Sequence, residues 1–344
     1  MKISIGVGGY GRSNTSNMVE FVQEAERLGV DAVWSAEAWG NDAVTSLAFL
    51  AGQTERIHLG TGIMQISARV PAMTAMTALS LNTLSNGRFR LGLGASGPQV
   101  VEGLHGVPYA APLTRLKETV QICRLAFAGE KLEINGKKHV LPLPDGEGKA
   151  LRLDQPVSDI PIYLATLGPK ALEFTGAAAD GWLGTSFSPE HCEAHFEYLR
   201  RGAESAGRTL ADLDICAAVS IAVGDNVEEL IDSRRANVAF QMGAMGSAET
   251  NFYNEAFQRA GYEEDAKAIQ ALWIEGKRDE AARRVPDAMI TEFQAIGTRD
   301  MVLDRLKKYR DVGVTSLNVR LDAAKSRDDR YALLEECVAF AGEL

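Results

Sequence analysis

The stretch "LGTGIMQISARVPAMT", residues 59–74, combines the end of a strand, a turn and the start of a helix. Its apolar run reaches Gly60 and Gly62, and Pro71 then stands where the first turn of a helix accepts proline. Glycine weakens a strand, so two of them at a strand end indicate that the backbone bends or that another group lies very close. The stretch therefore predicts a β/α unit with a crowded carboxyl end.

The same alternation continues in both directions along the 344 residues. Short apolar runs alternate with segments in which apolar residues recur at helical spacing. The expected strands are residues 2–8, 31–37, 56–62, 88–94, 160–165, 180–186, 214–223 and 314–321. Strands joined through helices pair in parallel, and a set of eight closes naturally into a barrel. The sequence predicts an α/β fold, a (β/α)8 TIM barrel with insertions, in preference to a doubly wound open sheet.

Two segments are longer than this repeat requires. In residues 130–159, Asn135-Gly136 lies between short β-prone runs and predicts a tight hairpin. Residues 244–296 are rich in alanine and charge and predict extra helices before the last β/α unit. No Pro/Gly-rich linker divides the chain, so we expect a single domain over residues 1–344. The insertions are expected to serve as lids or as contacts in an oligomer.

Composition and charge argue against several classes of partner. The chain has 46% hydrophobic and 24% charged residues, which is typical of a globular protein. A net charge of −10 and a pI near 5.2 argue against nucleic acid or an anionic membrane as main partner. No stretch is long and apolar enough for a signal peptide or a membrane span. Four cysteines without C-x-x-C spacing predict buried or free thiols in a reducing cytoplasm.

Chemistry in a barrel of this kind gathers at the carboxyl ends of the strands. The residues expected there are Gly6 to Gly9, Ser35 to Trp39, Thr61 to Ile63, Gly94 to Pro98, Ala165 to Lys170, Thr185, Ser186, Ser220 and Arg320. They include no Ser/His/Asp set and no pair of carboxylates. A site so rich in small residues suits a planar cofactor that carries the chemistry itself.

Two Gly-Pro pairs support a cofactor with a phosphate. In Gly97-Pro98 and Gly168-Pro169, proline takes the first position of a helix and leaves backbone amides open to an anion. Lys170 adds a positive charge beside the second pair. The alternative is that both pairs are only tight turns between strand and helix.

The chain resembles the bacterial luciferase-like superfamily over nearly its whole length. The stretches that carry the resemblance are residues 29–43, 59–98, 160–183 and 293–319. They are most similar to its deazaflavin-dependent branch, which includes methylenetetrahydromethanopterin reductase and the deazaflavin-dependent glucose-6-phosphate dehydrogenase. The resemblance implies a (β/α)8 barrel that binds coenzyme F420, an 8-hydroxy-5-deazaflavin, and transfers hydride between its C5 and a small organic substrate. It also implies a homodimer.

The resemblance assigns cofactor-binding residues position by position. It implies a cis peptide at Gly62-Ile63, so that the end of the third strand, Thr61, Gly62 and Ile63, backs the deazaflavin ring. Ala95, Ser96 and Gly97 are expected along the cofactor side chain. Thr166, Leu167, Gly168 and Pro169 are expected near its phosphate.

The chain departs from its family at the end of the second strand. Related deazaflavin enzymes often carry Asp-His there, where this sequence has Ala36-Glu37. Glu37 is the candidate catalytic residue, because a partly buried carboxyl group can acquire a pKa suited to proton transfer. The alternative is a solvated carboxylate at a strand end. Trp39 is expected to wall the substrate pocket or to lie buried without a functional role.

Other interpretations of the motifs are weaker. "GVGGYG", residues 6–11, matches a dinucleotide-binding pattern, but a polar spacer follows the glycines where a helix should begin. His191 and His195 have the spacing of a metal pair, although surface histidines are the preferred interpretation and no metal is expected. An FMN-dependent monooxygenase is the nearest alternative function, since it uses the same strand end. A non-catalytic ligand-binding barrel is the second alternative.

Overall fold

The computed structural model describes residues 1–7, 15–247 and 249–344. In this part of the chain, eight parallel strands form the closed barrel that the alternation predicts, and helices connect them. The barrel strands are β1 (Lys2–Gly6), β2 (Ala32–Ser35), β3 (His58–Thr61), β5 (Phe89–Gly94), β8 (Ile162–Leu164), β9 (Gly181–Gly184), β10 (Asp214–Val223) and β12 (Ser316–Arg320). The fold class predicted from the sequence is confirmed.

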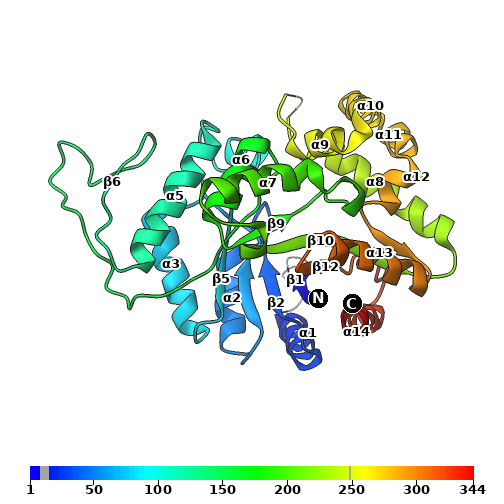
Figure 1. Ribbon diagram of the computed structural model, residues 1–344, viewed down its shortest axis with the longest axis horizontal. Coiled ribbons are helices and arrows are strands. Elements are labelled where there is room, and N and C mark those ends of the chain that lie inside the picture. The colour runs from blue at the N-terminus through cyan, green and yellow to red at the C-terminus, as the bar shows by residue number, and fades with distance from the viewer. Residues whose placement is uncertain (8–14, 248) are drawn as a thin grey trace. The chain divides into compact units, whose positions relative to one another are not determined.

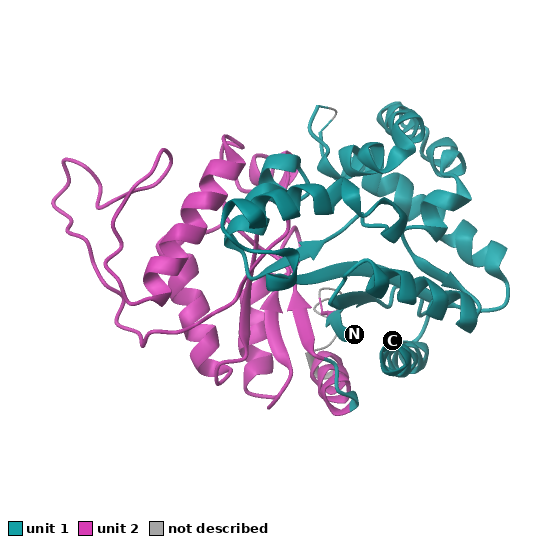
Figure 2. Ribbon diagram, in the orientation of Figure 1, with its two compact units in different colours: residues 1–5, 28–30, 166–344 teal, residues 6–27, 31–165 magenta. Residues whose placement is uncertain are grey.

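The chain divides into two compact units (Figure 2). Unit 1 comprises residues 1–5, 28–30 and 166–344, and unit 2 comprises residues 6–27 and 31–165. Unit 2 contributes β2, β3, β5 and β8 to the barrel, and unit 1 contributes β1, β9, β10 and β12. Because neither unit holds a full set of barrel strands, a single domain over the whole chain remains our proposal.

In unit 2 the strands pair in parallel in the order β2–β3–β5–β8. All of β5 is buried, as expected for a parallel strand that is covered on both faces. The short strand β4 (Met64–Gln65) also pairs with β5. The helices among these strands are α1 (Thr15–Leu28), α2 (Ala43–Ala51), α3 (Pro71–Leu84), α4 (Pro98–Val101) and α5 (Pro112–Phe127). Pro71, Pro98 and Pro112 each take the first position of their helix.

The segment 130–159 holds an antiparallel hairpin of β6 (Ile134–Asn135) and β7 (Val140–Leu141). Its loop is longer than the tight turn expected from Asn135-Gly136, because the backbone turns around a side chain. The buried carboxylate of Glu118, on α5, accepts hydrogen bonds from the backbone N–H groups of residues 137–139. Burial opposes ionisation of Glu118, but these bonds hold its pKa below the usual value.

In unit 1 the strands pair in the order β9–β10–β12–β1, and β11 (Ala295–Gly297) pairs with the end of β10. The helices that accompany them are α6 (Pro169–Ala178), α7 (Glu193–Ser205), α8 (Val227–Ala244), α13 (Arg299–Asp311) and α14 (Arg327–Glu343). Two 3₁₀ turns, η2 (Pro189–His191) and η3 (Leu210–Asp212), flank α7.

The segment 244–296 is helical, and its helices pack against α8 (Figure 1). Its elements are α9 (Phe252–Phe257), the π-helical turn η4 (Gln258–Tyr262), α10 (Glu263–Ile274), α11 (Arg278–Arg284) and α12 (Asp287–Thr291). Buried side chains from these elements, among them Phe257, Ile269 and Met289, form a hydrophobic core with Phe293, which follows α12, and with Val238 of α8. The segment therefore contributes a packed layer of its own.

The four cysteines carry no disulfide, and three of them, Cys123, Cys216 and Cys337, are buried. Burial raises the pKa of the Cys123 and Cys337 thiols to about 12, so both are unreactive at neutral pH. Among the described residues, no helix has the length and apolar character that crossing a bilayer requires.

Candidate functional site

The crowding predicted at the end of the third strand comes from a tryptophan. A Cβ atom at Gly60 would lie 2.3 Å from ring atoms of Trp34, whose indole covers this part of β3. That indole is 3% exposed and packs edge-on against Tyr163, with ring centroids 5.2 Å apart. Glycine is required at Gly60 because a side chain there would displace a buried aromatic pair.

The peptide bond Gly62-Ile63 is cis, as the resemblance implies. The neighbouring backbone is held to the end of β2, since the Gly62 N–H donates to the Ser35 carbonyl at 2.7 Å. Ile63 is partly exposed, and its side chain lies against Gly94, where a Cβ would be 3.0 Å from its Cδ1. Ile63 therefore presents an apolar surface beside a glycine of β5.

Thr61 is completely buried, and its hydroxyl serves the barrel itself. The Oγ1 donates to the Gly92 carbonyl at 2.8 Å and accepts from the Gly92 N–H at 2.9 Å. The single O–H donor of Thr61 is thus used within the sheet. The two bonds to Gly92 connect β3 to β5 next to Gly62 and Ile63.

Ala95, Ser96 and Gly97 follow β5 and are all partly exposed. Ser96 has a positive φ of 60°, and its carbonyl accepts a hydrogen bond from the Tyr109 hydroxyl at 3.1 Å. Burial raises the pKa of Tyr109 to about 12, which keeps this hydroxyl protonated as a donor. The loop of residues 95–97 is therefore anchored by Tyr109, while its own residues stay partly exposed.

Glu37 is more enclosed than a solvated strand end, with 9% of its surface exposed. Its Oε1 accepts from Arg69 Nη1 at 2.6 Å and from the Gln65 N–H at 2.8 Å. Its Oε2 accepts from Arg69 Nη2 and from the Ala43 N–H, both at 3.1 Å. Through these hydrogen bonds the carboxyl group joins the end of β2 to β4 and to the start of α2. The side chain of Arg69, a residue without a predicted role, is the main partner.

A pocket of about 260 Å³ lies in unit 2. Its lining includes Ala95, Tyr109 and the backbone segment from Ile66 to Pro71. Arg69 and Arg115 contribute guanidinium groups to the same lining. The pocket therefore combines one predicted cofactor residue with positive charge. Trp39 is not part of this lining and is 60% exposed, so the expectation that it lies buried is wrong.

Thr166, Leu167, Gly168 and Pro169 belong to unit 1, where they lead into α6. No side chain in the described part of the chain caps this helix at Gly168, and a Cβ built there would meet no atom within 4 Å. The Leu167 carbonyl accepts a hydrogen bond from Arg259 Nη2 at 2.7 Å. An uncapped helix start with open space and a neighbouring guanidinium is suited to an anion. Nothing in the sequence distinguishes Arg259 from other charged residues of the helical insertion.

The interpretation of His195 as a surface histidine is wrong. Its side chain is 1% exposed and packs beside Trp182 and Phe187, at centroid distances of 5.3 and 5.9 Å. Burial, with a further contribution from the positive charge of Arg259, lowers its pKa to about 3. The Trp182 Nε1–H in turn donates to the Thr166 carbonyl at 2.9 Å. The histidine sits on the buried face of α7, which the i, i+4 spacing alone did not reveal.

A second pocket, of about 170 Å³, lies in unit 1. It is lined by Thr185, Ser186, Ser220 and Arg320, four of the residues expected at strand ends. The structure thus brings together the residues that follow β9, the carboxyl-terminal half of β10 and the last residue of β12. The helical insertion and the segment after it complete the lining with Tyr253, Phe257, Phe293 and Gln294.

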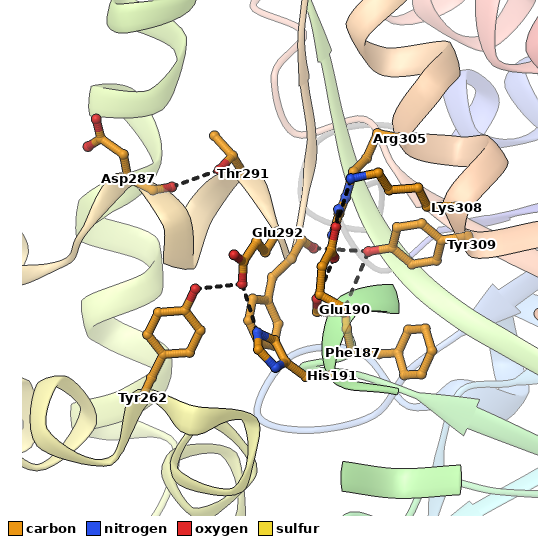
Figure 3. A network of polar contacts seen from close by, with 12 residues as sticks. Phe187, Glu190, His191, Tyr262, Asp287, Thr291, Glu292, Arg305, Lys308 and Tyr309 are labelled. Atoms are coloured by element: carbon orange, nitrogen blue, oxygen red, sulfur yellow. Dashed lines mark hydrogen bonds and ion pairs between the residues drawn. The ribbon is translucent and has the colours of Figure 1, made fainter. Parts of the chain in front are cut away.

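A polar network fixes the segment that carries Phe293 and Gln294 (Figure 3). The Glu292 carboxylate binds the Tyr262 hydroxyl at 2.5 Å and His191 Nε2 at 2.9 Å. The buried Tyr309 hydroxyl donates to the Phe293 carbonyl at 3.3 Å. Residues of η2, η4 and α13 thus bond Glu292 and Phe293. These contacts fix the backbone segment from which Phe293 and Gln294 line the pocket.

The remaining motifs gain no chemical role. Most of the glycine motif at residues 6–11 lies outside the described residues. His191 is bonded to Glu292, and His195 is enclosed by rings. In the described ranges, no three His, Cys, Asp or Glu side chains are grouped as a metal site would require.

Comparison with known proteins gives an independent result. The sequence model of the family described as luciferase-like monooxygenase matches residues 2–316. A Mycobacterium tuberculosis protein provisionally named as a coenzyme F420-dependent oxidoreductase is 37% identical, over 97% of this chain and 99% of its own. The 5,10-methylenetetrahydromethanopterin reductase of Methanolobus tindarius is 31% identical over 87% of this chain and 88% of its own.

Among solved structures, the coenzyme F420-dependent tetrahydromethanopterin reductase from Methanopyrus kandleri superposes with a TM-score of 0.80. It is 23% identical, and the match covers 97% of each chain. The same barrel architecture therefore extends over nearly the full length of both proteins.

Proposed function

The chain belongs to the luciferase-like monooxygenase family, and from this premise we propose that it is a coenzyme F420-dependent oxidoreductase. The observation that carries the proposal is the similarity of nearly the whole chain to relatives named for F420 or for a methanopterin reductase. Coenzyme F420 supplies a deazaflavin C5 that accepts or donates hydride. The alternative of an FMN-dependent monooxygenase is the weaker one, because the two most similar relatives named above are not named as monooxygenases. The same names make a non-catalytic barrel the weakest interpretation.

Residues of both units fit the cofactor chemically. In unit 2, Gly62, Ile63 and Ala95 to Gly97 are partly exposed and small or apolar, as a planar ring requires, with Thr61 fixing the strand below them. In unit 1, the uncapped start of α6 and Arg259 offer donors to a phosphate beside Thr166, Leu167, Gly168 and Pro169. We propose that these residues hold the cofactor, while the protein orients the substrate and excludes water.

The first prediction concerns the cofactor. The purified chain should bind F420 at least about tenfold more tightly than FMN, a difference of about 1.4 kcal/mol. Fluorescence titration with each compound measures the two affinities. As a control, oxygen consumption is followed with FMN and NADH present. Tight FMN binding with oxygen uptake would instead establish the monooxygenase function.

For Glu37, proton transfer remains a proposal with a competing role. The two oxygens of Glu37 already accept hydrogen bonds from Arg69, Gln65 and Ala43, so the side chain is well placed to position β4. We therefore expect Glu37→Gln to lower turnover by no more than about tenfold and to leave the shape of the pH–rate profile unchanged. Loss of one limb of that profile would show that Glu37 transfers the proton.

The homodimer and the cytoplasmic location also remain proposals. Large apolar side chains on α2 and α3 support the dimer, because Phe49, Met73, Met76 and Leu84 are each more than two-fifths exposed, at 49%, 47%, 43% and 58%. An apolar group on neighbouring helices is typical of a surface that a second subunit covers. The absence of a disulfide among the four cysteines agrees with a reducing compartment.

A further inference from the structure

Arg320 stands at the carboxyl end of β12. It is exposed, it lines the pocket of unit 1, and within the described ranges its guanidinium forms no ion pair or hydrogen bond. Arginine side chains that lie near a carboxylate usually pair with it, and no Asp or Glu is among the residues that line this pocket. Among the described residues, the lining of this pocket therefore carries one positive charge and no negative charge.

The rest of the lining offers neutral polar groups on an apolar wall. Burial raises the pKa of Tyr253, against the opposing effect of the Arg320 charge, so its hydroxyl remains a donor at neutral pH. Gln294 is 9% exposed, and its Oε1 has no hydrogen-bond partner in the described part of the chain. Buried amides are normally paired, so Gln294 has bonding capacity left for a ligand. Phe257 and Phe293, with ring centroids 4.4 Å apart, supply the apolar wall.

The size of the pocket restricts the ligand. A volume of about 170 Å³ is below that of pockets for drug-sized molecules, so the ligand is small. One guanidinium matches the single charge and planar fork of a carboxylate, whereas a phosphate dianion would need further cations. Arg320 is the only charged residue among those that line the pocket in the described structure.

We propose that this pocket binds the carboxylate of a small organic acid through Arg320, with Tyr253 and Gln294 as neutral partners of the same molecule. The assignment of this acid as the substrate rests on the proposed oxidoreductase function. The hydroxyl or carbonyl group on which an oxidoreductase acts would then lie next to the carboxylate-binding end.

The experiment compares acids with their uncharged analogues. Propanoate and 2-hydroxypropanoate, each against its primary amide, are titrated by calorimetry into the protein alone and into the protein loaded with F420. The wild-type chain should bind each acid at least about tenfold more tightly than its amide, since a hydrogen bond to a charged group contributes this much. Arg320→Gln should abolish the preference, and Arg320→Lys should retain part of it.

The matched control is Arg283→Gln, which removes the same charge from an exposed residue of α11 outside the pocket. This control should keep the acid preference. Equal binding of acid and amide by the wild type, or an unchanged preference in Arg320→Gln, overturns the proposal. Tighter binding of inorganic phosphate that depends on Arg320 also overturns it.

A separate titration distinguishes this proposal from the proposed function. F420 affinity should be unchanged in Arg320→Gln, and a loss of F420 affinity would assign the arginine to the cofactor phosphate instead. If the wild type fails to bind F420, the proposed function fails, while the acid and amide titrations of the same protein still decide the role of Arg320.

Discussion

Replacement of Gly202 by alanine should lower the free energy of unfolding by about 3 kcal/mol or more. A Cβ atom at Gly202, on α7, would lie 1.8 Å from the carbonyl oxygen of Glu173 on α6. Gly176 faces α7 in the same way, with the Leu199 carbonyl oxygen 2.0 Å from its Cβ position. Because the atoms struck belong to the backbone, no side-chain rotation can relieve the contact, and one helix must move.

Urea unfolding of Gly202→Ala, compared at equal m-value, measures this effect. The control is Gly342→Ala on α14, where a Cβ meets nothing within 4 Å and alanine favours the helix by up to about 1 kcal/mol. A stability of Gly202→Ala within about 0.5 kcal/mol of the wild type would contradict the close packing of α6 on α7. Since α6 begins at the predicted phosphate loop, the variant should also bind F420 more weakly.

His195 should make the protein less stable in mild acid. Burial lowers its pKa to about 3 in the folded chain, against about 6.5 when unfolded. The folded state therefore keeps the imidazole neutral while the unfolded state takes up a proton below pH 6.5. The stability associated with the neutral ring is complete above that pH and is lost as the pH falls toward 3, by about 2 kcal/mol between pH 7 and pH 5.

His195→Phe should remove most of this dependence, because phenylalanine fits among Trp182, Phe187 and Phe196 and does not titrate. Denaturant unfolding at pH 7 and pH 5 should show the stability difference shrinking by about 2 kcal/mol in the variant. His105→Phe makes the same change at an exposed residue and should leave the dependence as it is. An equal loss in the wild type and in His195→Phe would show that other groups control acid stability.

Much of the site was predictable, because barrel geometry places strand ends together. Thr185 and Ser186 directly follow β9, Ser220 lies three residues before the end of β10, and Arg320 ends β12. These three positions are far apart in the chain, and the structure places all four residues around one pocket. What the sequence did not reveal is the partner of each group. Arg69 meets Glu37 across 32 positions, and Arg259 reaches Leu167 across 92, and no local pattern marks such pairs.

The sequence by itself determined the alternation of strands and helices, the helix starts at proline and the residues at the strand ends. These properties depend on hydrophobic period and backbone preference, which act over a few residues. The tertiary structure alone decided that Trp34 covers Gly60, that Glu37 is enclosed by donors and that His195 is buried. Each of these depends on contacts between distant segments, and burial and pairing set the charge and freedom of a side chain only after those segments have packed.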